Sequence, residues 1–245
     1  ITIPRSVVKI ESDSFINCKS LEKIIIPNTV TSIGNNSFAN CVSLKTLNIP
    51  NSVKSIGMNA FSGCSSLKQV NIPASVSSIG SKAFSECKLL SKITILSSIN
   101  KISEYLFSKC TSLNQIEIPN SVKTIEKYSF QSCTSLSQII IPSTVNAINE
   151  GAFILCSSLT QIIIPSSVNS IGVNAFSQCK NLMKITIDPY KTKLMNDPFN
   201  KCTKLTHLVL ANTVNTTDNL NNFPFIQKFT TITIPPSVAV IESNS

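Results

Sequence analysis

The stretch from Leu44 to Cys64 decides the fold, and it reads LKTLNIPNSVKSIGMNAFSGC. Its first half alternates apolar and polar residues, with Leu47 and Ile49 on one side, as in a short half-buried strand. Pro50 follows at once, and because proline has no N–H to donate, it ends the strand and turns the chain. This half therefore predicts a short strand that is closed by a turn.

The second half of the stretch predicts how the chain returns to the same core. Val53 and Ile56 are expected to point inward along an extended or 3₁₀ segment. Gly57 is expected to occupy a turn that needs a positive φ. Phe61 and Cys64 are expected on a short helical turn whose i, i+3 face lies against the core.

The same pattern recurs every 23 residues along the chain. Phenylalanine keeps this spacing at Phe15, Phe38, Phe61, Phe84, Phe107, Phe130, Phe153, Phe176 and Phe199. All nine cysteines keep it too, at Cys18, Cys41, Cys64, Cys87, Cys110, Cys133, Cys156, Cys179 and Cys202. A leucine follows three residues after each cysteine, from Leu21 to Leu205. Such a repeat predicts an α/β solenoid in which each coil buries its apolar residues against the next.

The unit resembles the BspA-like, or treponemal-type, class of leucine-rich repeats. The matching residues are Leu-x-x-Leu-x-Ile-Pro at 44–50, Ser-Val-x-x-Ile-Gly at 52–57 and Ala-Phe-x-x-Cys at 60–64. The resemblance predicts a right-handed leucine-rich-repeat solenoid of about ten 23-residue units. One side is expected to be a concave parallel β-sheet, and the convex side to carry short strands, 3₁₀ segments or short helices.

The resemblance also implies a function and a source. It implies an adhesin-like protein, secreted or at the cell surface, that binds matrix proteins such as fibronectin or fibrinogen, or other cells. It offers no catalytic residues to transfer. The bias toward Ile, Asn, Lys and Ser favours a mucosal protist as the source.

We expect one domain over residues 1–245. Regular repeats are expected over 1–187, degenerate repeats over 188–234, where Asp188 replaces the turn proline, and a truncated repeat over 235–245. One residue is inserted between Val214 and Phe223. Because neither end carries a capping unit, the chain is expected to be part of a longer array.

Composition excludes several classes of protein. A hydrophobic content of 42% excludes disorder as the main state. The net charge is +9, but the lysines are scattered and Arg5 is the single arginine, so nucleic acid is not expected as a partner. No apolar run approaches the roughly 20 residues of a membrane span, so no transmembrane segment is expected.

The cysteines are expected to form a buried column of free thiols rather than disulfides. A spacing of 23 residues is not that of a metal-binding C-x-x-C motif. Cys202 is expected inside and the sole histidine, His207, outside, so the two are not expected to form a nucleophilic pair. The sequence therefore predicts neither an enzyme nor a cofactor, and it leaves the redox compartment open.

The outward strand residues are the candidate binding site, because solenoids bind through such extended faces. Three glutamines on successive strands lie beside two exposed isoleucines, with charged residues around them: Gln115, Gln138, Gln161, Ile140, Ile163, Glu117, Lys92 and Lys184. The alternative is that glutamine stacks and β-branched residues merely stabilise the sheet. Glycosylation sequons occur at Asn35 and Asn215.

The leading hypothesis is a recognition or adhesion protein that binds a matrix or cell-surface protein, or a glycan, through this sheet. An intracellular, cytoplasmic scaffold that docks another protein on the same sheet is the alternative. A third hypothesis is end-to-end self-association, because the strands at 1–3 and 232–234 present open edges.

Overall fold

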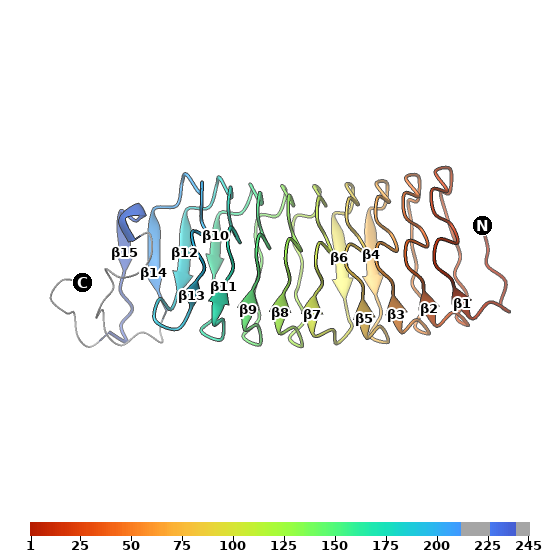
Figure 1. Ribbon diagram of the computed structural model, residues 1–245, viewed down its shortest axis with the longest axis horizontal. Helices are drawn as coiled ribbons and strands as arrows, with labels where there is room; N and C mark the ends of the chain where they lie inside the picture. Colours follow the sequence, from red (N-terminus) through yellow and green to blue (C-terminus); the bar gives the residue numbers. More distant parts are fainter. Residues whose placement is uncertain (212–225, 239–245) are drawn as a thin grey trace.

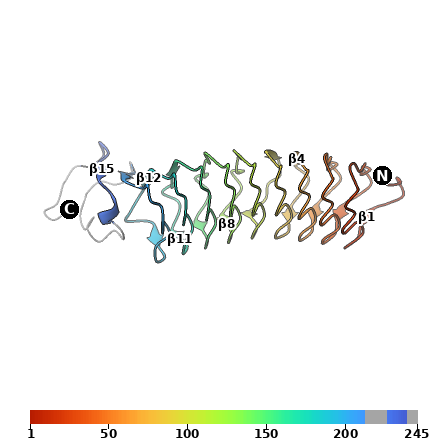
Figure 2. The ribbon, with the colours of Figure 1, turned by 90° about the horizontal axis from the view of Figure 1, so that it is seen from above.

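The chain winds into a parallel β-solenoid, which the computed structural model describes over residues 1–211 and 226–238 (Figure 1). Each coil lies beside the next along the sequence, from β1 at one end to β15 at the other. The axis of the stack is nearly straight in both ribbon views (Figures 1 and 2). The predicted solenoid of 23-residue coils is confirmed. Because curvature is small, we name its faces by their strands rather than as concave and convex.

One face, here called the long-strand face, carries the strands that precede the turn proline. These are β4 (Gln69–Ile72), β6 (Lys92–Ile95), β10 (Gln161–Ile163), β12 (Lys184–Ile187), β14 (His207–Leu210) and β15 (Thr231–Thr233). Their pairing is parallel but interrupted: β4 pairs with β6, and β10, β12, β14 and β15 form a second sheet. The other coils join through the isolated bridges Thr2–Ile25, Lys23–Thr46 and Glu117–Ile140.

A second face, the short-strand face, carries two-residue strands. These are β1 (Lys9–Ile10), β2 (Ser32–Ile33), β3 (Ser55–Ile56), β5 (Ser78–Ile79), β7 (Lys101–Ile102), β8 (Thr124–Ile125), β9 (Ala147–Ile148), β11 (Ser170–Ile171) and β13 (Lys193–Leu194). They form two parallel sheets that meet between β5 and β7. Of the two conformations expected for the Val53–Ile56 segment, the extended one is therefore observed.

The third side of each coil, the turn segment, holds the phenylalanine and cysteine columns without a helix. The helical turn expected over 60–64 is wrong, because Asn59 and Gly63 have φ values of 55° and 74°. Left-handed residues at this spacing redirect the backbone before an i→i+4 hydrogen bond can form. Alternate N–H groups donate to the next coil, as from Phe61 to the carbonyl of Ala83 at 2.8 Å, and the others donate within their own coil, as from Ser62 to the carbonyl of Asn59 at 3.0 Å. The one helix in the described ranges is the 3₁₀ helix η2 (Ile226–Lys228).

Gly57 is needed for close approach and not for a positive φ, so the expected reason for this glycine is wrong. A Cβ at this position would lie 2.6 Å from the backbone nitrogen of Asn35 on the preceding coil. Its N–H donates to the carbonyl of Ile33 at 2.8 Å. Glycine therefore lets two backbones pack at hydrogen-bond distance here.

The core runs unbroken through the stack. Nine phenylalanine rings stack along it, one from each coil, with neighbouring centroids 5.0 Å apart at Phe15–Phe38 and 6.2 Å apart at Phe84–Phe107. Stacked aromatic pairs are worth about 0.5–1.5 kcal/mol each beyond their burial. The serine of the repeat adds a polar link, since the Ser52 hydroxyl donates to the carbonyl of Val30 at 2.6 Å. Coil-to-coil contacts of this kind make stability a nearest-neighbour property.

The coil over residues 90–112 departs from the others. Leu96 stands at the proline position, Ser103 at the glycine position and the fully buried Leu106 at the alanine position. Leu106 is larger than the alanine that it replaces, and the Phe84 and Phe107 rings beside it have the widest spacing of the ring stack. Both faces are interrupted at this coil: β5 does not pair with β7, and β6 does not pair with the next coil.

The C-terminal coils keep the ladder although their sequence drifts. Asp188 is buried at the proline position, and its carboxylate accepts the N–H groups of Tyr190 and Lys191 at 3.1 and 3.2 Å. His207 pairs with Thr231, an offset of 24 residues (231 − 207) instead of 23. That offset fits the one-residue insertion expected between Val214 and Phe223, which itself lies outside the described residues.

Candidate functional site

The predicted site residues all belong to the long-strand face. Lys92 and Lys184 begin β6 and β12, and β10 carries Gln161 and Ile163. The other four lie on the two segments between β6 and β10, at Gln115, Glu117, Gln138 and Ile140. Every one of the eight is exposed.

A groove of about 560 Å³ crosses three successive coils on this face. Its lining comes from residues 92–96, 115–120, 138–140 and 142. Five predicted site residues line it, namely Lys92, Gln115, Glu117, Gln138 and Ile140. The structure therefore brings these five together. Gln161, Ile163 and Lys184 lie on the following coils and outside the groove.

The groove lies where the long-strand ladder is interrupted. In the described part of the chain no backbone hydrogen bond joins β6 to residues 115–118. One coil earlier, the N–H of Leu96 donates to the carbonyl of Ile72 at 2.9 Å. The residue one repeat after Leu96 is Pro119, which has no N–H to make the equivalent bond. Proline is the usual residue at this repeat position, so the bond from Leu96 is an exception that Pro119 cannot repeat at the carbonyl of Ile95.

The groove combines apolar walls with two charges of opposite sign. Leu96 and Ile140 are 63% and 81% exposed, which is high for large aliphatic side chains. No ion pair is formed by Lys92 or Glu117 within the described ranges. Gln138 donates a long hydrogen bond of 3.5 Å to the Gln115 side chain. Polar and apolar groups are both left available to a partner.

The other three predicted residues sit on a regular sheet. Gln161 lies opposite Lys184 and Ile163 opposite Thr186 in the β10–β12 pairing. Ile163 is 63% exposed. The expected three-glutamine ladder therefore forms a side-chain hydrogen bond only between Gln115 and Gln138 among the described residues.

The sequence reasoning missed Leu96 and Asn120, which also line the groove. A signal for Leu96 was present, because it stands where most coils carry proline. No such signal marks Asn120, since that position is occupied by small or polar residues in most coils.

The thiol column is confirmed for eight of the nine cysteines, which are buried and free. Cys18 is only half-buried. Each buried thiol donates to a phenylalanine carbonyl of the preceding coil, as from Cys110 to Phe84 at 3.1 Å. Burial raises the pKa of Cys110 and of Cys156 to about 12. These thiols are therefore held protonated and act as core residues.

The pair at the end of the column differs. A hydrogen bond with Cys179 lowers the pKa of Cys202, and the same bond, together with burial, raises that of Cys179. Cys202 is nevertheless buried, and its thiol donates to the carbonyl of Phe176 at 3.0 Å. His207 lies exposed on β14, so Cys202 and His207 face different ways as expected.

The described part of the chain shows neither a metal-binding cluster nor a membrane-spanning helix. Within residues 1–211 and 226–238, no group of three or more His, Cys, Asp or Glu could hold a metal ion. None of the helices in the same ranges is long and apolar enough to cross a membrane. At the first sequon, the side-chain oxygen of Asn35 accepts the N–H of Met58 at 2.8 Å. The second, Asn215, lies outside the described residues.

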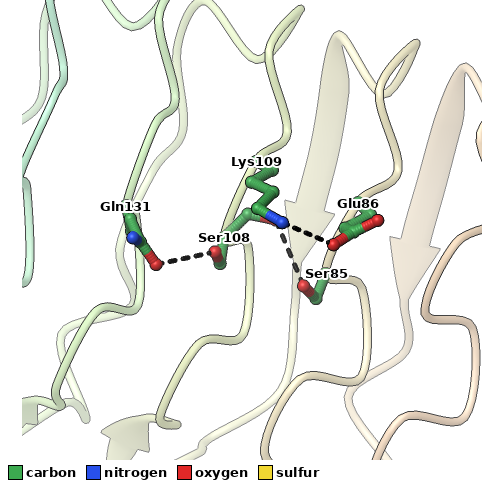
Figure 3. Close-up of polar contacts among 5 residues, drawn as sticks. All are labelled: Ser85, Glu86, Ser108, Lys109 and Gln131. Atoms are coloured by element: carbon green, nitrogen blue, oxygen red, sulfur yellow. Dashed lines mark hydrogen bonds and ion pairs between the residues drawn. The ribbon is translucent and has the colours of Figure 1, made fainter.

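Polar side chains on the turn segment bond to one another across coils (Figure 3). Lys109 pairs with Glu86 at 2.7 Å, and the Ser108 hydroxyl donates to the Gln131 side chain at 3.2 Å. The Ser85 hydroxyl donates to the carbonyl of Ser108 at 3.3 Å. These groups satisfy each other, so the cluster holds neighbouring coils together and offers little to a ligand.

Comparison with known proteins identifies the repeat. The family model for the BspA type leucine rich repeat region matches residues 1–114, 54–182 and 123–245, which together span the chain. A search of the curated proteins found no match. A match to this repeat type supports a role in protein interaction.

Solved structures give the same architecture. The chain is similar to a leucine-rich repeat protein from Bacteroides ovatus, with 31% identity and a TM-score of 0.84 over 98% of this chain. It spans 62% of the length of that protein. A leucine-rich repeat protein from Eubacterium ventriosum is 22% identical, with a TM-score of 0.54, over 99% of this chain and 80% of that one. Both are bacterial, so nothing here supports the expected protist source.

Proposed function

Because the chain belongs to the BspA type leucine rich repeat family, we propose that it is a non-enzymatic recognition protein that binds other proteins through its long-strand face. The observation that carries this proposal is the groove, where Leu96 and Ile140 are exposed beside Lys92 and Glu117, which form no ion pair with any residue that the structure describes. Exposed aliphatic side chains beside directional polar groups are what a protein interface needs at its centre.

The kind of ligand and the cellular location form a second part of the proposal. We propose that the chain acts at the cell surface or after secretion, and that its ligands are matrix or cell-surface proteins. The net charge of +9 favours partners with acidic surfaces, because opposite charge speeds encounter.

Surface plasmon resonance with immobilised fibronectin and fibrinogen tests this proposal. Ile140→Asp places a charge on the exposed apolar wall and should weaken binding about tenfold or more. Met58→Asp is the matched control, because Met58 is 47% exposed but lies on the turn segment. Failure of the wild-type chain to bind either protein saturably at physiological salt counts against the proposed ligands. Equal loss in both variants counts against the proposed face.

One observation favours a second candidate, an intracellular scaffold: all nine cysteines are free. Free thiols are the rule in reducing compartments, although burial can also protect them. Digestion of intact cells with an external protease separates the two candidates. Cleavage of the chain without lysis supports the surface protein, and full protection supports the scaffold.

A further inference from the structure

Resting on the proposed function, we propose that the groove binds an arginine side chain of an extended protein segment. An acidic residue two positions away in that segment reaches Lys92. Glu117 is the anchor for the guanidinium group.

Glu117 is placed to receive a cation. It lies on the middle one of the three coils that line the groove. Its side chain is exposed, and in the described part of the chain its carboxylate enters no ion pair. By contrast, Glu22 on the same face is already paired with Lys45 at 2.8 Å. A carboxylate without a partner in a partly enclosed groove favours binding of a positive side chain.

The walls favour a cation that has an apolar stem. Leu96 comes from the coil before Glu117 and Ile140 from the coil after it, and both are highly exposed. The methylene groups of an arginine can pack between them while the charged end reaches the carboxylate. Burial of this kind covers apolar surface that water otherwise contacts.

The polar groups around Glu117 favour arginine over lysine. Ile95 lines the groove, and Pro119 at the matching position of the next coil has no N–H to donate to the Ile95 carbonyl. The Gln115 side chain adds another acceptor. A guanidinium carries five N–H donors in one plane and can serve several acceptors at once, whereas an ammonium group is a compact point charge.

Lys92 adds a requirement for an acidic residue in the bound segment. It lines the same groove, on the coil before Glu117, and no ion pair within the described ranges neutralises it. A lone arginine would be repelled by this ammonium group. In an extended segment, residues i and i+2 project from the same side and lie about 7 Å apart. An acidic residue at that spacing offsets the charge of Lys92 and fixes the direction of the segment.

The test uses the whole chain and a fluorescent peptide, Thr-Arg-Val-Glu-Thr with blocked ends, in an anisotropy titration. Norleucine in place of the arginine keeps the apolar stem but removes the charge, and should weaken binding about tenfold. Glu117→Gln should weaken the arginine peptide about tenfold and leave the norleucine peptide unchanged. Lys92→Gln should affect only peptides that contain the glutamate.

Controls make each outcome decisive. Glu22→Gln removes a carboxylate from the same face outside the groove and should leave the titration unchanged. Glu117→Lys should bind a peptide with glutamate in place of arginine better than the wild type does. The proposal is overturned if the arginine peptide does not bind saturably, if norleucine binds as well, or if Glu117→Gln has no effect.

The outcome also separates this inference from the proposed function. Suppose that Ile140→Asp abolishes binding of a matrix protein while Glu117→Gln leaves it intact. The long-strand face is then the binding face, and the arginine site is wrong. If neither variant changes a binding event that the wild type shows, the proposed function of this face fails as well.

Discussion

Single cysteines show at the residue scale how one side chain can fill space and join two coils. Cys110 is fully buried, and its thiol donates to the carbonyl of Phe84 on the preceding coil at 3.1 Å. The raised pKa of this thiol follows from burial, which disfavours the thiolate. Since thiolates are the reactive form, the buried column should be chemically silent in the folded protein.

Native-state alkylation is therefore expected to distinguish Cys18 from the buried thiols. Iodoacetamide should label the half-buried Cys18 first, and Cys110 should react only on unfolding. Mass spectrometry of the labelled peptides against time measures this order, with a urea-unfolded sample as the control for complete labelling. Uniform labelling of the folded chain would contradict a closed core.

Tyr128 and Glu150 form a second residue-scale link, and it responds to pH. The tyrosine hydroxyl donates to the carboxylate at 2.5 Å, and Lys127 lies 3.2 Å from the same carboxylate. The hydrogen bond from Tyr128 and then that from Lys127 lower the pKa of Glu150 below its ordinary 4.5. The same hydrogen bond and burial raise the pKa of Tyr128 from 10.0 to about 12.

The sign of the pH effect follows from these shifts. The contribution of Glu150 to the stability of the folded state is fully present above pH 4.5, and it is lost as the pH falls through the lower pKa that Glu150 has in the folded state. The contribution of Tyr128 is fully present below pH 10.0, and it is lost as the pH rises through the folded-state pKa of about 12. Tyr128→Phe should thus show a smaller fall in urea midpoint between about pH 7 and pH 3 than the wild type. Tyr105→Phe, in the neighbouring ring of the stack, is the control that should keep the wild-type slope.

At the scale of the coil, glycine avoids a close contact between neighbouring backbones. The turn around Gly57 packs on the backbone of Asn35 at a distance that no Cβ can share. At the same repeat position Met195 is tolerated, and its N–H still donates to the carbonyl of Ile171 at 2.9 Å. Coils without glycine keep this backbone hydrogen bond as well, as from Asn149 to the carbonyl of Ile125 at 2.8 Å.

Gly57→Ala should lower the free energy of unfolding by about 1–3 kcal/mol, because the added methyl forces two backbones apart. Met195→Ala at the equivalent position should change it by less than about 0.5 kcal/mol, since this side chain is partly exposed. Urea denaturation followed by circular dichroism measures both. A Gly57→Ala chain as stable as the wild type would show that the coils can separate there without cost.

Much of the coil could be predicted from sequence because its period fixes which columns face inward. Phe61 and Cys64 were expected in the core and lie there, fully buried. The turn that carries them was expected to be helical, because the i, i+3 spacing of apolar residues is also produced by turns with left-handed residues. Asn59, which has a positive φ, was a signal for the latter, since asparagine tolerates that conformation.

The candidate site could be predicted only in part. Outward residues such as Gln115 and Ile140 follow from alternation along the strand, so their exposure was foreseeable. The groove itself was not foreseeable, because it depends on how far two coils separate. Leu96 and Leu106 replace the usual proline and alanine of the coil, and alternation along the strand does not tell what these replacements do to its contact with the next coil.

At the scale of the whole stack, β1 pairs with β2 alone among the strands described over 1–211 and 226–238. When the segment 1–245 is produced by itself, the other edge of β1 therefore presents backbone groups to solvent. Apolar side chains are exposed on the same coil, with Ile1 at 62%, Val8 at 54% and Ile16 at 40%. Open strand edges with apolar neighbours are the usual starting point for association between chains.

The isolated chain should therefore associate at this end as concentration rises. The double variant Val8→Lys with Ile16→Lys should stay monomeric, because charges on an open edge oppose pairing. Met58→Lys adds a charge at an exposed residue away from the end and should leave association unchanged. Sedimentation velocity over a wide concentration range measures this. A wild-type chain that is strictly monomeric would rule out self-association through this coil.

The irregular coil over residues 90–112 has a consequence for how any long ligand lies on the surface. A perfectly periodic solenoid offers an elongated partner many equivalent positions, each displaced by one coil, and the partner could slide among them. Leu96 is 63% exposed and stands where most coils carry proline, so the groove beside it marks one position on the surface and reduces this degeneracy. The groove therefore favours one register of the ligand along the stack over the others.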